Sequence, residues 1–264
     1  MRAAVRLATA VMTGLGEPGP LLKTRRWEAG PFEQSWRGDV LRKLDENLWV
    51  AEQPLKFMGL EVGARMTIVR LADGALWVHS PLRLIPERRQ AVDALGPVRF
   101  LVAPNRLHHL FIGEWMAVWP EARAYASPGL PEKRKDLRFH GVLSERAPLE
   151  WAGQVEVLPW RGAPSLGEVV FFHSASRTLV LTDSLHNPGS AASALTCFVF
   201  KLFGGRTGRP STWLIDRLAN RDRTAARRTV DTILQWDIRR VILAHGDVVE
   251  HDAARAFRDA YAWL

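Results

Sequence analysis

The sequence contains a single cysteine, Cys197. One cysteine excludes an intramolecular disulfide and a zinc cluster built on several thiolates. Any metal site in this chain must therefore be built from histidine and carboxylate side chains. Cys197 itself lies in the apolar run 195–200, which indicates packing and not a nucleophile.

The sequence also lacks a long hydrophobic run. No stretch reaches the ~18 to 20 apolar residues that span a bilayer. The nearest, 191–203, is too short and contains Lys201. Residues 1–12 combine basic side chains with a mildly apolar run, but no clear small-residue cleavage site follows them. We therefore expect an irregular N-terminal arm in a cytoplasmic protein without a transmembrane segment.

Acidic residues are fewer than basic ones, 28 against 36, which gives a formal net charge of +8. Such a balance favours acidic partners in general, namely nucleic acid, phosphates or an anionic membrane surface. A solvated basic surface is the simpler interpretation, because net charge alone is a weak functional signal. The 264 residues are 47% hydrophobic, which is enough to bury a sizeable core.

The order of apolar and polar residues predicts two β-meanders, each followed by a strand and helices. Residues 1–40 are rich in Gly, Pro and charge and are expected to form an N-terminal extension, with one domain over 41–264. Connections among the first strands are too short for crossovers, which predicts antiparallel pairing. Two sheets face to face with helices outside would satisfy this order. The predicted strands are 48–53, 64–71, 75–79, 98–103, 123–126, 154–158, 168–173, 178–183 and 239–244, and the helices 87–95, 110–119, 192–204, 211–236 and 253–264.

Possible metal ligands follow three of the predicted strands. They are His108 with His109, then Asp183, then His245. Polar groups at the carboxyl ends of core strands are where open α/β sheets keep their ligand sites. Neutral imidazole and carboxylate suit zinc, iron or manganese without thiolates. A single histidine at a strand end is more often structural, so it is the combination that predicts a metal site.

The other histidines are less informative. His79 ends a predicted strand, directly before Ser80-Pro81, and is a candidate to face the site. His173 follows an apolar pair within a strand and is expected to be a core or edge residue. His140, His186 and His251 are interpreted as surface or loop residues.

At these residues the chain resembles a known family. From about Leu48 to Leu264 it looks like the metallo-β-lactamase fold, which implies an αββα sandwich with a metal site at one edge of two sheets. More narrowly, it resembles an uncharacterised branch of that superfamily. Members of the branch carry an Asn-x-x-His-His-x-x-x-Gly-Glu-Trp loop, a Phe-Phe-His before Ser-Arg-Thr-Leu, and a late Ala-His-Gly. These motifs stand here at 105–115, 171–179 and 244–246.

The family's metal motif is degenerate in this chain. Its usual His-x-His-x-Asp-His would place the first two histidines at Pro104 and Arg106, or at Asn105 after a one-residue shift. Its middle histidine falls in 162–164, where none is present. The resemblance then implies either a single-ion site or a relic that binds no metal, with the guanidinium of Arg106 expected where the first metal of the family would lie. The implied ligands are His108, His109, Asp183 and His245.

Three functions remain open. The first is a mononuclear metal-dependent hydrolase of an unidentified small molecule, using one zinc or iron ion. In that function Asp247 or Glu114 would orient ligands, and His79, Asn105 and Arg106 are further candidates near the site. The second is a catalytically silent member that binds a small molecule or a protein. The third is nucleic-acid processing, but the acidic residues interrupting the basic region 217–228 favour a salt-bridged surface there.

Overall fold

The computed structural model describes residues 40–57, 59–189 and 192–264. The predicted N-terminal extension over 1–40 therefore lies outside the described residues, apart from Val40. No helix within the described ranges is long and apolar enough to cross a bilayer.

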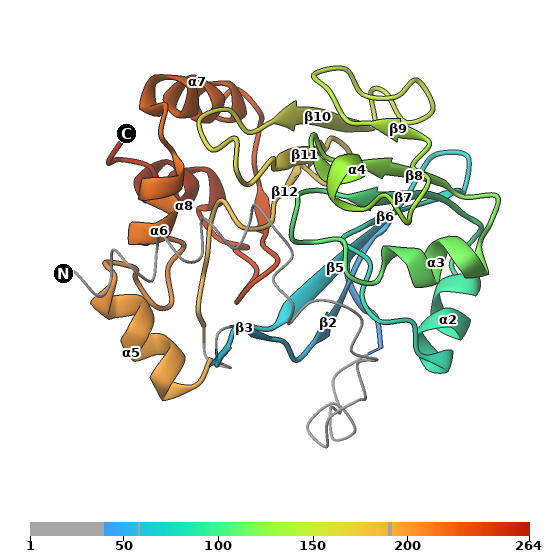
Figure 1. Ribbon diagram of the computed structural model, residues 1–264, viewed down its shortest axis with the longest axis horizontal. Coiled ribbons are helices and arrows are strands. Elements are labelled where there is room, and N and C mark those ends of the chain that lie inside the picture. Colours follow the sequence, from blue (N-terminus) through green and yellow to red (C-terminus); the bar gives the residue numbers. More distant parts are fainter. Residues whose placement is uncertain (1–39, 58, 190–191) are drawn as a thin grey trace.

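Two sheets form the centre of the structure (Figure 1). The larger has seven strands in the order β1-β2-β5-β6-β7-β8-β9, antiparallel from β1 to β6 and parallel from β6 to β9. The smaller has four strands in the order β10-β11-β12-β13, with only β12 and β13 parallel. The bounds in the larger sheet are β1 Arg42–Asp45, β2 Leu48–Gln53, β5 Ala64–Arg70, β6 Leu76–His79, β7 Val98–Ala103, β8 Arg123–Ala126 and β9 Gly141–Val142. Those in the smaller are β10 Val155–Pro159, β11 Val169–His173, β12 Thr178–Val180 and β13 Arg240–Ile242, and a separate hairpin pairs β3 Lys56–Phe57 with β4 Leu60–Glu61.

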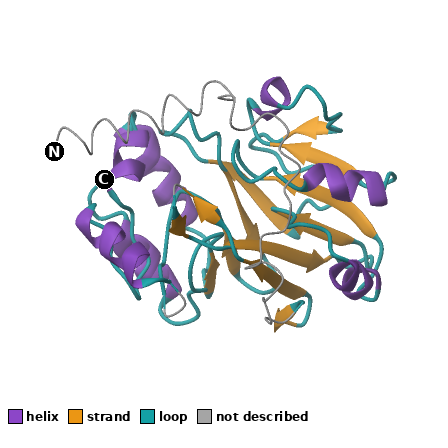
Figure 2. Cartoon of the chain, turned by 60° about the horizontal axis from the view of Figure 1, so that its bottom comes forward, coloured by secondary structure: helices purple, strands orange, loops and turns teal. Residues whose placement is uncertain are grey.

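Helices cover the outer faces of both sheets (Figure 2). Helices α2 and α3 lie against the larger sheet, where Val92 and Trp115 join its outward-facing apolar residues in one buried cluster. Helices α7 and α8 cover the smaller sheet, where Val230 and Phe257 join a second cluster. This arrangement is an αββα sandwich and confirms the predicted fold. The bounds are α2 Pro86–Asp93, α3 Ile112–Val118, α4 Leu130–Lys133, α5 Ala194–Leu202, α6 Leu214–Ala219, α7 Arg223–Ile233 and α8 Ala253–Ala260.

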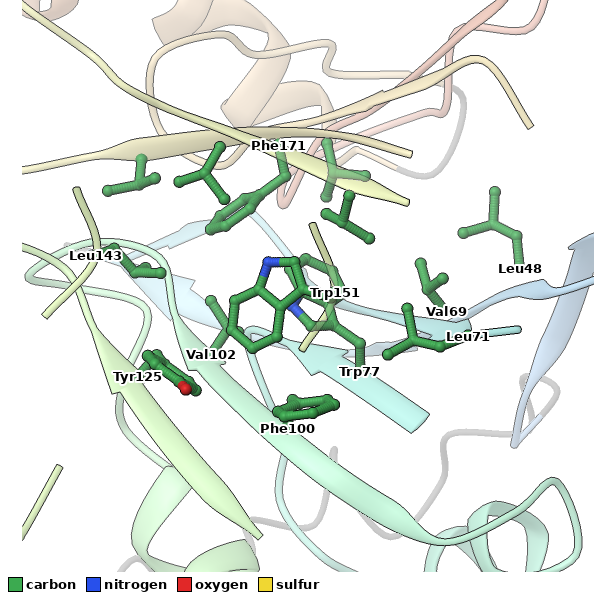
Figure 3. Packing of buried hydrophobic residues seen from close by; sticks show 14 of the residues in the cluster. Leu48, Val69, Leu71, Trp77, Phe100, Val102, Tyr125, Leu143, Trp151 and Phe171 are labelled. Carbon is green, nitrogen blue, oxygen red and sulfur yellow. The ribbon is translucent and has the colours of Figure 1, made fainter. Parts of the chain in front are cut away.

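An aromatic core fills the space between the sheets (Figure 3). Trp77 of the larger sheet lies edge-on to Phe171 of the smaller one, with ring centroids 5.1 Å apart. Trp151, from the loop before β10, packs against Trp77 in the same way. Because side chains alternate along a strand, Trp77 faces the other sheet, while its neighbours in β6 join the cluster beneath α2.

The structure differs from the sequence prediction mainly at element ends. The segment 211–236, predicted as mostly helical, is interrupted between α6 and α7. There Asn220 donates from Nδ2 to the Asp216 carbonyl, and Asp222 caps α7 by accepting from the Ala225 amide. Such polar side chains bond locally to backbone and so compete with helix continuation. The short strands β1, β3, β4 and β9 were not predicted, because two to four residues carry little periodicity.

Candidate metal centre

Three side chains from both sheets meet at one edge of the sandwich. His108 follows β7 of the larger sheet, whereas Asp183 and His245 follow β12 and β13 of the smaller one. The Nε2 of His108 lies 3.2 Å from the Nε2 of His245 and 3.3 Å from the Oδ1 of Asp183. The Nε2 of His245 lies 3.1 Å from the same oxygen. The three atoms form a nearly equilateral triangle.

This triangle has the dimensions of a metal-ligand face. Zinc–nitrogen and zinc–oxygen bonds of about 2.0–2.1 Å in tetrahedral geometry separate neighbouring ligand atoms by about 3.3 Å. The observed separations of 3.1 to 3.3 Å fit that value. Two imidazoles and one carboxylate also make a suitable donor set for zinc or iron. These residues therefore fit a divalent ion, with a fourth position left open.

Each imidazole is oriented by a bond to its other nitrogen. The Nδ1 of His245 donates to the Gly63 carbonyl at 2.7 Å, which turns its Nε2 toward the cluster. The Nδ1 of His108 lies 2.9 Å from the Oγ of Ser80. Ser80 has a φ of 53°, in the left-handed region that few non-glycine residues adopt. Such partners set the tautomer and the ring angle of a metal-binding histidine.

Asn105 connects the two loops that carry His108 and Asp183. Its Oδ1 accepts the amides of Leu107 and His108 at 2.8 and 2.7 Å, which holds the turn after β7. Its Nδ2 donates to Thr182 and, at 2.6 Å, to the Oδ2 of Asp183. The second bond leaves the Oδ1 of Asp183 facing the imidazoles. Asn105 was predicted as a candidate near the site, and the structure places it there.

The Asp183 side chain is 13% exposed, and its carboxylate is ionised. Burial alone would raise its pKa, but the charges and hydrogen bonds of His108 and His245 outweigh burial and hold the pKa well below its ordinary value. An ionised carboxylate is the form of this side chain that binds a cation.

Glu168 supports Asp183 from inside the smaller sheet, and the sequence analysis missed it. Its carboxyl group accepts the amides of Thr182, Asp183 and Ser184 at 2.6, 3.1 and 2.7 Å. Burial, and then the charge of Asp183, raise the pKa of Glu168 to about 7. The sequence does contain one indication of this role. Glu168 directly precedes the apolar residues of β11, and a carboxylate next to a buried strand needs hydrogen-bond partners within the protein.

Arg65 supports His245 and was also missed. Only 6% of its side chain is exposed, and the guanidinium donates to the carbonyls of Leu243 and Gly246 on either side of the histidine. It also pairs with Glu52 at 2.8 Å. Burial lowers the pKa of Arg65, and the charge of Glu52 opposes that shift. The indication in the sequence was that Arg65 is a charged residue within the apolar strand β5, where it needs partners inside the protein.

His109 lies outside the cluster, which corrects its predicted grouping with the other three ligands. Its Nδ1 lies 3.0 Å from the Nη1 of Arg134, and the triangle of His108, Asp183 and His245 forms without it. Burial, followed by the charges of Lys133 and Arg134, lowers the pKa of His109 to about 3. The two histidines diverge because consecutive residues in the tight turn that Asn105 caps point to different sides.

His79 faces the space between the sheets but is not one of the three clustered residues. Its ring stacks on Trp77 with centroids 5.6 Å apart and lies edge-on to Phe171. Neither ring nitrogen has a hydrogen-bond partner among the described residues. Burial, and then the charge of His108, lower the pKa of His79 to about 3. His79 is therefore neutral at physiological pH.

The remaining candidates occupy other positions. The Oε2 of Glu114 accepts the amide of Leu84 at 2.9 Å at the surface. Asp247 follows the His245 loop, and its carboxylate lies so close to Gly189 that a Cβ there would be 1.7 Å from Oδ2. Arg106 packs its aliphatic stem and Nε against the backbone turns at Gly129 and Gly167. Its guanidinium was predicted at the family's first metal position, and that role stays a proposal.

His186 is closer to the centre than predicted. It was interpreted as a surface or loop residue, yet burial lowers its pKa to about 3, with a further contribution from His245. Its ring centroid lies 5.9 Å from that of His245 and 5.7 Å from that of Phe200 in α5. The sequence did indicate this proximity, because His186 is only three residues after Asp183. His186 therefore lies between the centre and α5.

Comparison with solved structures places the chain among metallo-β-lactamase folds. The DIM-1 metallo-β-lactamase exposed to ceftazidime is 16% identical over 84% of this chain and 96% of its own, with a TM-score of 0.59. The enzyme from Pontibacter korlensis is 13% identical over 85% and 99%, with a TM-score of 0.58. The enzyme from Erythrobacter litoralis, with β-mercaptoethanol in its active site, is 13% identical over 85% and 96%, at 0.59. These likenesses show the fold.

Sequence comparison gives the family. None of the curated proteins compared matches the chain. A family described as a domain of unknown function, DUF4336, matches residues 45–196, which is more than half of the chain. That stretch includes the Asn-x-x-His-His loop and Asp183, and it ends before His245. The chain therefore belongs to the DUF4336 family and has the metallo-β-lactamase fold.

Proposed function

We propose that this chain is a mononuclear metal-dependent hydrolase of a small molecule, working in the cytoplasm with one zinc or iron ion. The observation that carries the proposal is the triangle of His108, Asp183 and His245. Catalytic zinc sites characteristically have three protein ligands and one open position, whereas structural sites are closed by four. The three ligand atoms present here fit the catalytic type.

A divalent ion held by these three residues would supply Lewis-acid polarisation of an ester, amide or phosphoryl oxygen and would lower the pKa of water. The chain's own residues prepare that position. Ser80 and Gly63 orient the two imidazoles, and Asn105 turns the carboxylate toward them. Their role is to hold the ligand atoms in place before an ion arrives, which reduces the reorganisation needed on binding.

We propose one ion and not two because of the residues at the positions where the metallo-β-lactamase family binds its other metal. Proline and alanine side chains carry no donor atoms, and an arginine guanidinium is a fixed cation that does not ligate metals. Pro104, Arg106 and Ala163 therefore leave the second position of the family without protein ligands. The same losses favour a second candidate, a catalytically silent member that binds a small molecule or a protein.

Nucleic-acid processing is less well supported. In the basic region 217–228, Arg217 lies over the ring of Trp263, at 5.6 Å from the centroid. Arg223 lies over the same ring at 5.7 Å. Both guanidiniums are thus engaged with the chain's own surface, and we do not propose this function.

The deciding experiment measures metal content and hydrolysis together. The protein would be expressed with zinc or iron in excess, freed of loose metal by gel filtration, and analysed by mass spectrometry for ions per chain. We expect about one ion per chain, and loss of most of it in His245→Ala, where only two ligands remain. Ester, lactone and phosphodiester substrates would then be screened, with His245→Ala as the inactive control.

Two outcomes would contradict the proposal. A wild-type chain that retains no ion after metal-replete expression would favour the silent binding protein. Equal metal content in the wild type and in a variant lacking both Asp183 and His245 would place the ion elsewhere.

A further inference from the structure

Helix α5 presents three large apolar side chains to solvent. Leu195, Phe198 and Leu202 are 60%, 63% and 68% exposed. Their spacing of three and four residues places them on one face of the helix. On the opposite side, Thr196 and Phe200 are buried against the chain. Helix α5 therefore differs from an ordinary surface helix, because its most apolar face is exposed to water.

The next helix extends this apolar surface. Leu214 and Leu218 of α6 are 38% and 44% exposed. The beginning of α6 lies beside the end of α5, because Trp213 stacks on Phe200 with ring centroids 5.1 Å apart. Both helices lie at the outer edge of the structure (Figure 1). We call Leu195, Phe198, Leu202, Leu214 and Leu218 the α5–α6 surface. Single exposed hydrophobic residues are ordinary, but a group of this kind marks an interaction site.

The charged residues on α5 and on the segment that leads to α6 have one sign. Between residues 192 and 215 the sequence contains Lys201, Arg206 and Arg209 and no acidic residue. All three cations are exposed. The nearest acid along the chain is Asp216, which is buried, bonded to the Trp213 amide, and has its pKa raised well above its ordinary value by burial. An apolar face with a cationic border is thus exposed to solvent.

We propose that the α5–α6 surface docks on an anionic lipid membrane. Interfacial helices bury a face of Leu and Phe to the depth of the acyl boundary, while Lys and Arg pair with acidic headgroups. Juxtaposed cations each strengthen binding to an anionic leaflet. A second copy of the chain fits less well, because a two-fold interface would bring the same cationic border against itself. The proposal rests on this surface and not on the proposed function.

Docking in this orientation would bring the membrane close to the metal centre. Phe200, on the buried side of α5, lies against His186, which in turn lies beside His245. Thr196 of α5 donates to the carbonyl of Glu61 in β4. Two residues later, Gly63 accepts the hydrogen bond that orients His245. The membrane-facing helix and the centre are thus connected through one layer of side chains.

The test is sedimentation of the full chain with lipid vesicles. Vesicles of phosphatidylcholine alone would be compared with vesicles containing one third phosphatidylglycerol, at low and at high salt. We expect binding to the anionic vesicles only, and weaker binding as salt rises. Leu195→Ser/Phe198→Ser/Leu202→Ser should lose at least about tenfold in affinity, because the interfacial apolar area is gone.

Charge is tested by reversal at matched net charge. Lys201→Glu/Arg206→Glu/Arg209→Glu removes the cationic border and should weaken binding by at least about tenfold. Lys43→Glu/Arg99→Glu/Lys135→Glu changes three exposed cations elsewhere and should bind like the wild type. Leu149→Ser is the control for the apolar variant, because Leu149 is 93% exposed in the loop before β10. Circular dichroism would verify that every variant is folded.

Several results would overturn the proposal. Equal weakening by the two charge reversals would mean that net charge alone attracts the vesicles. Unchanged binding in the apolar variant would exclude α5 from the contact. Absence of vesicle binding, together with a wild-type dimer that the apolar variant turns into a monomer, would assign the surface to a second copy of the chain.

Discussion

Asn105 and Asp183 are 78 residues apart in the chain, and a hydrogen bond of 2.6 Å from Nδ2 to Oδ2 joins them. Asn105 follows a strand of the larger sheet, and Asp183 follows a strand of the smaller one. The same asparagine also holds the turn that presents His108. One amide side chain therefore positions two of the three clustered residues.

The first prediction concerns this amide. Asn105→Ala leaves the partly buried amides of Leu107 and His108 without their acceptor, which should cost about 1–3 kcal/mol of stability. Zinc affinity should fall about 10- to 100-fold, since the partner that orients Asp183 is lost. Urea unfolding and a competitive zinc-chelator titration measure the two effects. Asn47→Ala, which removes a bond to Arg70 in the larger sheet, is the control. Wild-type zinc affinity in Asn105→Ala would contradict the prediction.

The second prediction separates two neighbouring histidines. His108→Ala should abolish tight zinc binding, because it removes one corner of the triangle. His109→Asn keeps a polar atom near the position of Nδ1 for Arg134 and should retain about one zinc per chain. Metal analysis of both variants decides between the structure and the sequence-based grouping. Loss of zinc in His109→Asn, with His108→Ala unaffected, would reverse the assignment.

The third prediction concerns the loop of His245. Arg65→Lys replaces the planar guanidinium by an ammonium group. The ammonium group cannot bond to Glu52 and to the carbonyls of Leu243 and Gly246 at the same time. Stability should fall by about 1–3 kcal/mol, because buried carbonyls lose their donors. Arg42→Lys alters the other, exposed partner of Glu52 and should change stability by less than about 0.5 kcal/mol. Equal unfolding midpoints for Arg65→Lys and the wild type in urea would refute it.

The fourth prediction is a loss of stability in acid that comes from three buried histidines. Burial lowers the pKa values of His79, His109 and His186 to about 3. Below pH 6.5 the unfolded chain binds protons at these positions and the folded chain does not. The contribution of these histidines to stability is therefore complete above pH 6.5 and is lost as pH decreases toward 3, by about 1.4 kcal/mol per pH unit for each histidine.

His79→Phe tests this dependence. The substitution keeps an aromatic ring between Trp77 and Phe171 and removes one titrating group. In chelator-treated protein, the unfolding free energy in urea should fall between pH 7 and pH 5 by about 2 kcal/mol less than it does in the wild type, which is the contribution of one histidine. His251→Ala, at an exposed position, should leave the decrease unchanged. An identical pH dependence in His79→Phe and the wild type would show that His79 does not contribute.

Apolar patterning was sufficient to predict the sandwich, because β2, β5, β7 and β11 are runs whose burial follows from their composition. The positions of His108, Asp183 and His245 after strands were enough to predict that they meet. The divergence of His109 was not predictable, since it depends on the turn that Asn105 caps. Glu168 and Arg65 were missed for a related reason. Each acts by bonding to distant backbone, and a sequence pattern contains no record of such partners.

The clustered residues come from two sheets, and this has a mechanical consequence. An ion bound to all three would close chain segments of 75 residues from His108 to Asp183 and 62 residues from Asp183 to His245. Closing long segments removes entropy from the unfolded chain, as a cross-link does. Withdrawing the ion would thus loosen both loops together. Amide hydrogen exchange at Leu107 and at Asp247, which lie in loops that follow strands of different sheets, should quicken in parallel when a chelator is added.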